Sequence, residues 1–120
     1  MSILIVDDNV TLLQNIARSF TRCGYKVSTA IGINQARQIL QDGETTAVLL
    51  DLQLPDGHGL DLLEELRAKS PDLPVIIISG ANTPENRDRS CVLGVTAFLT
   101  KPFALSQLHA ILENSNPVFA

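Results

Sequence analysis

Five polar residues stand at the ends of short apolar runs in this sequence: Asp7, Asp8, Asp51, Ser79 and Lys101. Carboxylates held close together repel one another, which raises their pKa values unless a cation lies among them. Hard oxygen ligands suit Mg²⁺, with Mn²⁺ as an alternative. A lysine adds a positive charge, a serine hydroxyl adds a donor, and a carboxylate in such surroundings can form an aspartyl phosphate. These residue types therefore predict metal-dependent phosphoryl transfer with Asp51 as the reactive group.

The stretch around Asp51 indicates how that group is positioned. The run from Ala47 to Leu50 contains no polar residue, and a short apolar run ended by turn residues is typical of a strand buried on both faces. Pro55 and Gly57 shape the loop that follows. Such a strand delivers Asp51 to its C-terminal end, where ligands bind in open parallel sheets.

Strands and helices alternate along the chain. Apolar and β-branched runs predict five strands, over residues 2–6, 26–30, 47–50, 75–79 and 95–100. Apolar residues at helical spacing predict a helix after each strand, of which the polar one near residues 84–93 should be weakly anchored. Alternation of this kind implies a parallel sheet with helices on both faces, and 2-1-3-4-5 is the common doubly wound order. We therefore predict a flavodoxin-like, three-layer α/β/α fold in which the acidic residues converge.

The composition fits one domain and argues against several classes of protein. The chain has 120 residues, is 45% hydrophobic and lacks tryptophan, so we expect an aliphatic core. The net charge is −4 with dispersed lysines and arginines, which argues against nucleic-acid or membrane-surface partners. Without a signal peptide or an apolar span, we expect a cytoplasmic location. Residues 1–114 should form the domain and residues 115–120 a tail or linker stub, and Cys23 and Cys91 should be buried or half-buried thiols.

The ordered set of residues resembles the receiver domain of bacterial two-component response regulators. The resemblance covers residues 2–113, and its carriers are Asp7-Asp8 after ILIV, Asp51 in LLDLQLPDGHG, Ser79 after VIII, and Lys101-Pro102-Phe103. It implies that Asp51 is the phosphoacceptor in a phosphorelay. The donor would be the phosphohistidine of a histidine kinase or a histidine phosphotransfer protein. The chain would catalyse only its own phosphorylation and dephosphorylation, and would not act as an enzyme on other substrates.

The resemblance also implies a set of ligands around the phosphoacceptor. Asp8 would bind Mg²⁺ directly and Asp7 mainly through water, and the backbone carbonyl of Gln53 would complete the protein ligands beside Asp51. Lys101 would contact the phosphoryl group and, before phosphorylation, Asp51.

The resemblance further implies a conformational switch. Ser79 matches the switch hydroxyl, Phe98 matches the aromatic residue that turns inward with it, and the bond before Pro102 should be cis. The surface formed by the last two predicted helices and the strand between them would then change its partner. That partner could be an output domain, a downstream protein or a second copy of the chain, and a single-domain regulator, a DNA-binding regulator and a hybrid kinase all remain open.

Each residue also has a simpler interpretation. Asp7 and Asp8 could cap a helix, and Asp51 could be a turn residue. Ser79 alone could be a loop hydroxyl and Lys101 a solvated charge. His58 beside the reactive loop is interpreted as a solvated residue without a catalytic role, and His109 as part of a polar helix face.

Three other classes of protein share part of this pattern. A phosphorylation-independent pseudo-receiver would act as an interaction module, and the complete acidic and basic set argues against it. A phosphatase of the haloacid dehalogenase type needs Asp-x-Asp, whereas the present residues are Asp51-Leu52-Gln53. A flavodoxin-like cofactor carrier needs a glycine- and hydroxyl-rich phosphate loop where Asp7-Asp8 stand, and two acids would repel a flavin phosphate.

Overall fold

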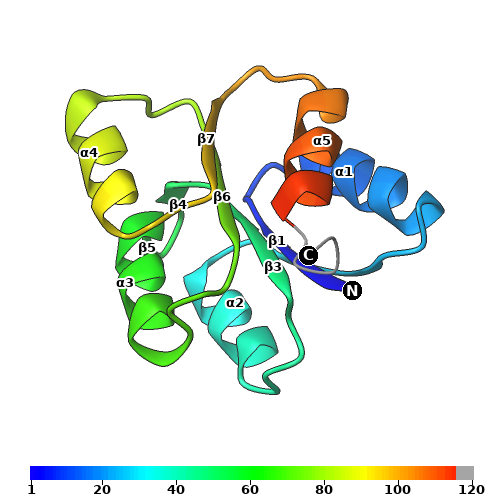
Figure 1. Cartoon of the computed structure of the whole chain (residues 1–120), viewed down its shortest axis with the longest axis horizontal. Coiled ribbons are helices and arrows are strands. Elements are labelled where there is room, and N and C mark those ends of the chain that lie inside the picture. The colour runs from blue at the N-terminus through cyan, green and yellow to red at the C-terminus, as the bar shows by residue number, and fades with distance from the viewer. Residues whose placement is uncertain (116–120) are drawn as a thin grey trace.

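One parallel sheet forms the centre of the computed structural model, which describes residues 1–115 (Figure 1). Its strand order is β2-β1-β3-β6-β7, which is 2-1-3-4-5 when these strands are numbered along the chain, so the predicted topology is confirmed. The strands are β1 (Ser2–Val6), β2 (Lys26–Ala30), β3 (Ala47–Leu50), β6 (Val75–Ser79) and β7 (Ala97–Thr100). The last strand therefore begins two residues later than predicted.

Helices cover both faces of the sheet (Figure 1). They are α1 (Val10–Arg22), α2 (Ile33–Leu40), α3 (Gly59–Lys69), α4 (Pro84–Val92) and α5 (Leu105–Ser115). One core cluster joins α1 and α5 to the sheet, and the other joins α2 and α3. The end of α5 lies within the tail predicted from residue 115, and residues 116–120 lie outside the described part of the chain.

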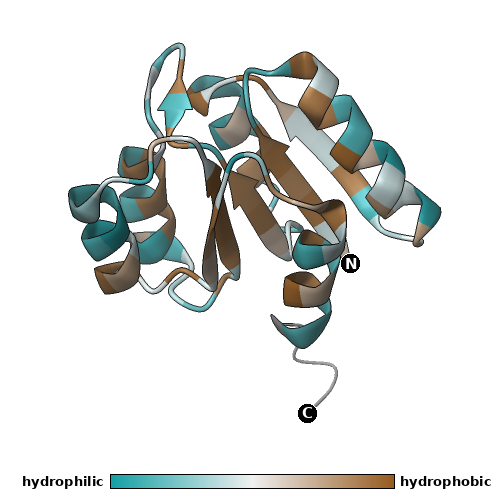
Figure 2. Ribbon diagram, turned by 90° about the horizontal axis from the view of Figure 1, so that it is seen from above, coloured by the Kyte–Doolittle hydropathy of each residue, from teal (hydrophilic) through white to brown (hydrophobic). Residues whose placement is uncertain are grey.

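Alternating side chains of the strands supply both halves of the core. Leu4, Val48 and Ile77 pack toward α2 and α3, whereas Ile5, Leu49 and Ile76 pack toward α1 and α5. The middle strands are apolar along most of their length (Figure 2), with Ser2 at the start of β1 and Ser79 at the end of β6, because strands buried on both faces do not alternate with polar residues. The C-terminal ends of β1 and β3 lie level, since Val6 pairs with Leu50 in the register.

Helix α4 has fewer buried residues than α2 and α3, the two helices of the other core cluster. Its one buried residue is Ser90, whose hydroxyl donates to the carbonyl of Asn86. Arg89 joins α4 to α3 through ion pairs with Asp61 and Glu64. The weak anchoring predicted from the polar sequence is therefore confirmed, because α4 buries no apolar side chain. Exposed ion pairs, rather than apolar contacts, join it to α3.

Several expectations about single residues are wrong. Cys23 and Cys91 are exposed free thiols. His109 lies between two helices, where its Nε2 is 2.7 Å from the Ser19 hydroxyl and its ring stacks on Phe20. Helical spacing alone placed His109 on a polar face, because spacing does not show which helix packs alongside. Within the described residues, no helix is long and apolar enough to cross a membrane.

Candidate functional site

The acidic residues meet where β1 and β3 end. Asp7 is fully buried, Asp51 is almost fully buried and Asp8 is exposed. Each offers a carboxylate oxygen that lies within 4.8 Å of the others. Backbone hydrogen bonds position the two buried acids, because the N–H of Asp7 donates to Ala30 and the N–H of Asp51 donates to Val6. The parallel ladder thus extends one residue past each strand and delivers both carboxylates to one place.

Lys101 reaches the same place from its position directly after β7, the edge strand of the sheet. Its Nζ donates to Oδ2 of Asp7 at 2.6 Å and to Oδ2 of Asp51 at 3.2 Å. Its backbone N–H donates to the carbonyl of Ser79 at 2.9 Å, which carries the ladder one residue past β7. The peptide bond between Lys101 and Pro102 is cis. The lysine therefore bridges the two buried acids directly.

The charged groups at this site shift one another's pKa values. Burial raises the pKa of Asp7, although hydrogen bonds from Lys101 and from the Asn9 N–H oppose that effect and the charge of Asp51 adds to it. Burial by itself lowers the pKa of Lys101, but the hydrogen bond to Asp7 and the charge of Asp51 outweigh it, so that the Lys101 pKa is raised. Lys101 is therefore cationic at neutral pH. One cation among three carboxylates leaves an excess of negative charge.

The donor set of this acidic site fits Mg²⁺. Closely spaced carboxylate oxygens are the hard ligands that Mg²⁺ prefers, and the exposed Asp8 leaves one side open for water or phosphoryl oxygens. A second cation would also relieve the repulsion between the acids. The N–H of Gln53 lies 3.4 Å from Oδ1 of Asp51, so Gln53 is beside the acidic site as well.

Ser79 ends β6, so it lies at the C-terminal ends of the strands, where the acidic site also lies. The side chain is fully buried, and its hydroxyl accepts a hydrogen bond from the Ala81 N–H at 3.0 Å. Phe98 stands in β7 opposite Ile77, half-buried against the α2–α3 core cluster. The structure thus brings Asp7, Asp51 and Lys101 into direct contact, whereas the hydroxyl of Ser79 is bonded to the loop before α4 and Phe98 packs farther back along β7.

Residues 51–59, here called the acceptor loop, connect β3 to α3 through a short hairpin. The hairpin pairs β4 (Gln53–Leu54) with the antiparallel β5 (Gly57–His58). The loop is closed at its base by a hydrogen bond from the Gly59 N–H to the carbonyl of Leu52 at 2.8 Å. Strands of two residues leave no periodic signal in a sequence, which is why the hairpin was not predicted.

Gly59 and His58 fix the start of α3 against the phosphoacceptor backbone. A Cβ on Gly59 would lie 2.9 Å from the Cα of Leu52 and closer still to the carbonyl oxygen of Asp51. His58 caps α3, because its Nδ1 accepts a hydrogen bond from the Leu60 N–H at 3.1 Å. The interpretation of His58 as a solvated loop residue is therefore wrong, and its role in this structure is that of a helix cap.

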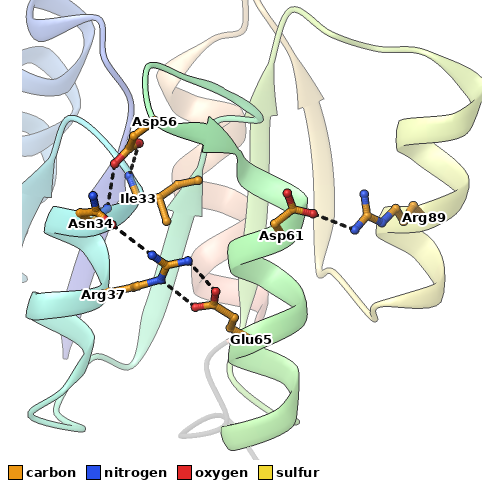
Figure 3. Close-up of polar contacts among 7 residues, drawn as sticks. All are labelled: Ile33, Asn34, Arg37, Asp56, Asp61, Glu65 and Arg89. Atoms are coloured by element: carbon orange, nitrogen blue, oxygen red, sulfur yellow. Dashed lines mark hydrogen bonds and ion pairs between the residues drawn. The ribbon is translucent and has the colours of Figure 1, made fainter.

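Asp56 at the tip of the hairpin was missed by the sequence analysis. Its carboxylate accepts hydrogen bonds from the N–H groups of Ile33 and Asn34 at the start of α2 (Figure 3). These bonds lower the pKa of Asp56. The sequence held one signal, since Gly32 stands at the N-cap of α2 and has no side chain to cap it. The same face carries the Arg37–Glu65 ion pair between α2 and α3 (Figure 3).

Two curated relatives match nearly the whole chain. The transcriptional regulatory protein BasR of Escherichia coli (strain K12) is 38% identical over 110 residues, which is 92% of this chain and 50% of that protein. The photosynthetic apparatus regulatory protein RegA of Cereibacter sphaeroides is 30% identical over 112 residues, which is 92% of this chain and 61% of that protein. The chain therefore spans only about half to three-fifths of the length of these relatives.

Solved structures with the same fold include signalling domains. The non-phosphorylated HemR receiver domain from Leptospira biflexa superposes with a TM-score of 0.90 at 32% identity, covering 95% of this chain and 92% of that one. A response regulator protein from Burkholderia pseudomallei, solved with a phosphorylated aspartic acid, a calcium ion and citrate, has a TM-score of 0.86 at 25% identity and covers 98% of this chain and 70% of that one.

A family model covers almost the same span as the similar structures. The model described as the response regulator receiver domain matches residues 3–113. That span contains all five strands and the acidic site with its lysine. This chain belongs to the receiver domain family of two-component response regulators.

Proposed function

We propose that this chain is a phosphoacceptor switch in which Asp51 takes a phosphoryl group from a phosphohistidine. The donor is a histidine kinase or a histidine phosphotransfer protein. The observation that carries the proposal is the bridge from Lys101 Nζ to Asp7 and Asp51 beside the exposed Asp8. A buried carboxylate held beside a cation and two further acids has the surroundings that phosphoryl transfer needs, namely positioning and neutralisation of charge.

In the proposed reaction, a carboxylate oxygen of Asp51 attacks the phosphorus atom. The new O–P bond forms as the P–N bond to the donor imidazole breaks, and the imidazole retains the electron pair and takes up a proton. Lys101 stays cationic and holds its charge at the place where the phosphoryl oxygens arrive. The chain acts in this way on its own Asp51 only.

Asp7, Asp8 and Asp51 would hold Mg²⁺ or Mn²⁺ together with the backbone carbonyl of Gln53. The metal, when bound, would supply positive charge and open coordination positions for phosphoryl oxygens. Asp7 is already oriented by the Asn9 N–H, which donates to its Oδ1 at 2.9 Å. The excess of negative charge at the acidic site supports this assignment.

Phosphorylation would change the surface formed by α4, β7 and α5. The added charge of about −1.5 to −2 would draw Ser79 and Lys101 inward, and the loop before α4 and Phe98 would follow. The hydrogen bond between the Ser79 hydroxyl and the Ala81 N–H supports this coupling, because moving the hydroxyl must release that loop. The weakly anchored α4 then shifts between two populations rather than folding anew.

The partner of that surface would be an output domain or a downstream protein, with a homodimer as a further arrangement. The names of BasR and RegA as regulatory proteins, and their greater length, support an output domain. Hydrogen exchange with and without beryllofluoride tests the switch. We expect changed protection within residues 80–103, and equal protection in both states would contradict it.

Labelling with acetyl phosphate tests the site assignment. Wild-type protein and Asp51→Asn are incubated with acetyl phosphate, with and without Mg²⁺, and the intact mass is measured. We expect one phosphoryl group on the wild type in the presence of Mg²⁺ and none on Asp51→Asn. Labelling that survives Asp51→Asn would refute the assignment, and a wild type that takes no label would favour the phosphorylation-independent pseudo-receiver.

A further inference from the structure

We propose that Asp56 is a positioning residue, which ties the tip of the acceptor loop to α2 and thereby sets the affinity of the acidic site for Mg²⁺. The inference rests on the proposed function, because it concerns the same site. It adds a residue five positions beyond Asp51 that touches neither the phosphoryl group nor the metal.

The contact with α2 uses both oxygens of the Asp56 carboxylate. Oδ1 accepts from the Ile33 N–H at 2.8 Å, and Oδ2 accepts from the Asn34 N–H at 3.0 Å. These N–H groups belong to the first turn of α2, where no carbonyl of the helix can satisfy them. A negative charge at a helix N-terminus also interacts favourably with the helix dipole. Asp56 therefore caps α2 from another element.

Two glycines make room for this contact. A Cβ on Gly32 would lie 2.8 Å from Oδ1 of Asp56 and 3.1 Å from Oδ2. The φ of Gly32 is −164°, an extended conformation open to any residue, so the carboxylate rather than the backbone requires glycine there. A Cβ on Gly57 would lie 2.8 Å from Cδ1 of Ile33. The tip of the loop and the start of α2 therefore fit closely around one carboxylate.

The contact bears on the metal because Gln53 stands between the two fixed ends of the acceptor loop. The base is held by the buried Leu52 and its hydrogen bond to Gly59, and the tip is held by Asp56. A loop released at its tip has more conformations to lose when the carbonyl of Gln53 binds a cation. Groups that hydrogen-bond directly to metal ligands typically change metal affinity by roughly 10- to 100-fold, and Asp56, which acts through the loop, should fall at the lower end of that range.

A set of single variants tests the role of the carboxylate. We expect Asp56→Ala to weaken Mg²⁺ binding, measured by calorimetry, about tenfold. The Mg²⁺ concentration for half-maximal acetyl phosphate labelling should rise equally, while the rate at saturating Mg²⁺ is unchanged. Asp56→Asn should be intermediate, because its amide oxygen can still accept a hydrogen bond. In metal-free protein, the amides of residues 53–59 should exchange faster in Asp56→Ala than in the wild type.

Gly32→Ala provides a second, independent perturbation, because it displaces the carboxylate without removing it. It should reproduce the weaker Mg²⁺ binding of Asp56→Ala. The double variant should bind Mg²⁺ no more weakly than Asp56→Ala alone, since the added methyl group then meets no carboxylate. Glu65→Ala is the matched control, because it removes the ion pair between α2 and α3 while Arg37 keeps its hydrogen bond to Asn34, and it should bind Mg²⁺ like the wild type.

Different failures have different meanings. Wild-type Mg²⁺ affinity and exchange in Asp56→Ala would overturn the inference and leave the proposed function standing. Additive effects of Gly32→Ala and Asp56→Ala would also overturn it, and so would a Glu65→Ala variant that binds Mg²⁺ as weakly as Asp56→Ala, because general loosening of this face would then be the cause. A wild type that neither binds Mg²⁺ nor takes a phosphoryl group would overturn the proposed function together with the inference.

Discussion

Gly59→Ala is expected to destabilise the protein by about 2 kcal/mol, although helix propensity alone predicts the opposite. Gly59 is the first residue of α3, and replacing glycine by alanine in a helix gains at most about 1 kcal/mol. The new Cβ would lie 2.9 Å from the Cα of Leu52 and would overlap the carbonyl oxygen of Asp51. Overpacking of this kind costs about 1–3 kcal/mol. The upper end of this range applies because both neighbouring atoms belong to backbone, which cannot rotate away as a side chain can. Subtracting the gain in helix propensity leaves a net loss of about 2 kcal/mol.

Urea unfolding followed by far-ultraviolet circular dichroism measures this change. The matched control is Gly80→Ala, because a Cβ there would meet no atom within 4 Å and the backbone of Gly80 is not in the left-handed region. We expect the control to be neutral or more stable by about 0.4–1 kcal/mol. If Gly59→Ala is as stable as the control, the close approach of α3 to the Asp51 backbone does not constrain the chain and the reasoning is refuted.

Three further predictions concern the charged groups. Lys101→Met leaves the buried Asp7 without its cation and should lower the free energy of unfolding in urea by about 2 kcal/mol, less than for a fully buried pair because the Lys101 side chain is a quarter exposed. Added Mg²⁺ should recover part of that loss. Unchanged stability would contradict the proposed bridge between Lys101 and the two acids. Arg89→Ala should leave the free energy of unfolding almost unchanged, because exposed ion pairs contribute little to stability, yet it should speed hydrogen exchange across α4, whose one buried residue is Ser90. Unchanged exchange would show that the ion pairs do not hold α4. The pKa of Asp56 is lowered in the folded state, so its ionised form contributes stability above the unfolded value of about 3.9, and that contribution is lost as the pH falls through the folded value. The stability difference between wild type and Asp56→Asn should therefore be largest near neutral pH and shrink below about pH 4, and a difference independent of pH would contradict the capping role.

The topology and the positions of the acids follow from local features of the sequence. The runs ILIV, AVLL and VIII are too apolar and too short for anything but strands buried on both faces, and helices between them leave few ways to order the sheet. Once the order is 2-1-3-4-5, Asp7 and Asp51 must be neighbours, because β1 pairs with β3 in the structure. The acidic site was therefore predictable before any coordinate was known.

Contacts between distant segments could not be predicted in the same way. The capping of α2 by Asp56 joins residues 22 and 23 positions apart, and a glycine at an N-cap does not name the group that replaces its side chain. The stacking of His109 on Phe20 depends on α5 lying beside α1, so a count of apolar spacing within α5 placed the histidine on the wrong face. The exposure of both cysteines likewise depends on what packs around them.

The sequence by itself thus determined which residues are chemically able to form the site and which strand each one ends, because strand burial and strand ends are encoded in consecutive residues. Tertiary structure alone decided how those residues are held. It added Asp7 to the contact between Lys101 and Asp51 that the resemblance implied, set Gly59 against the backbone of Asp51 and tied the acceptor loop to α2 through Asp56. Each of these contacts joins segments whose distance and orientation are set by packing of the whole core, and no local run of residues carries that information.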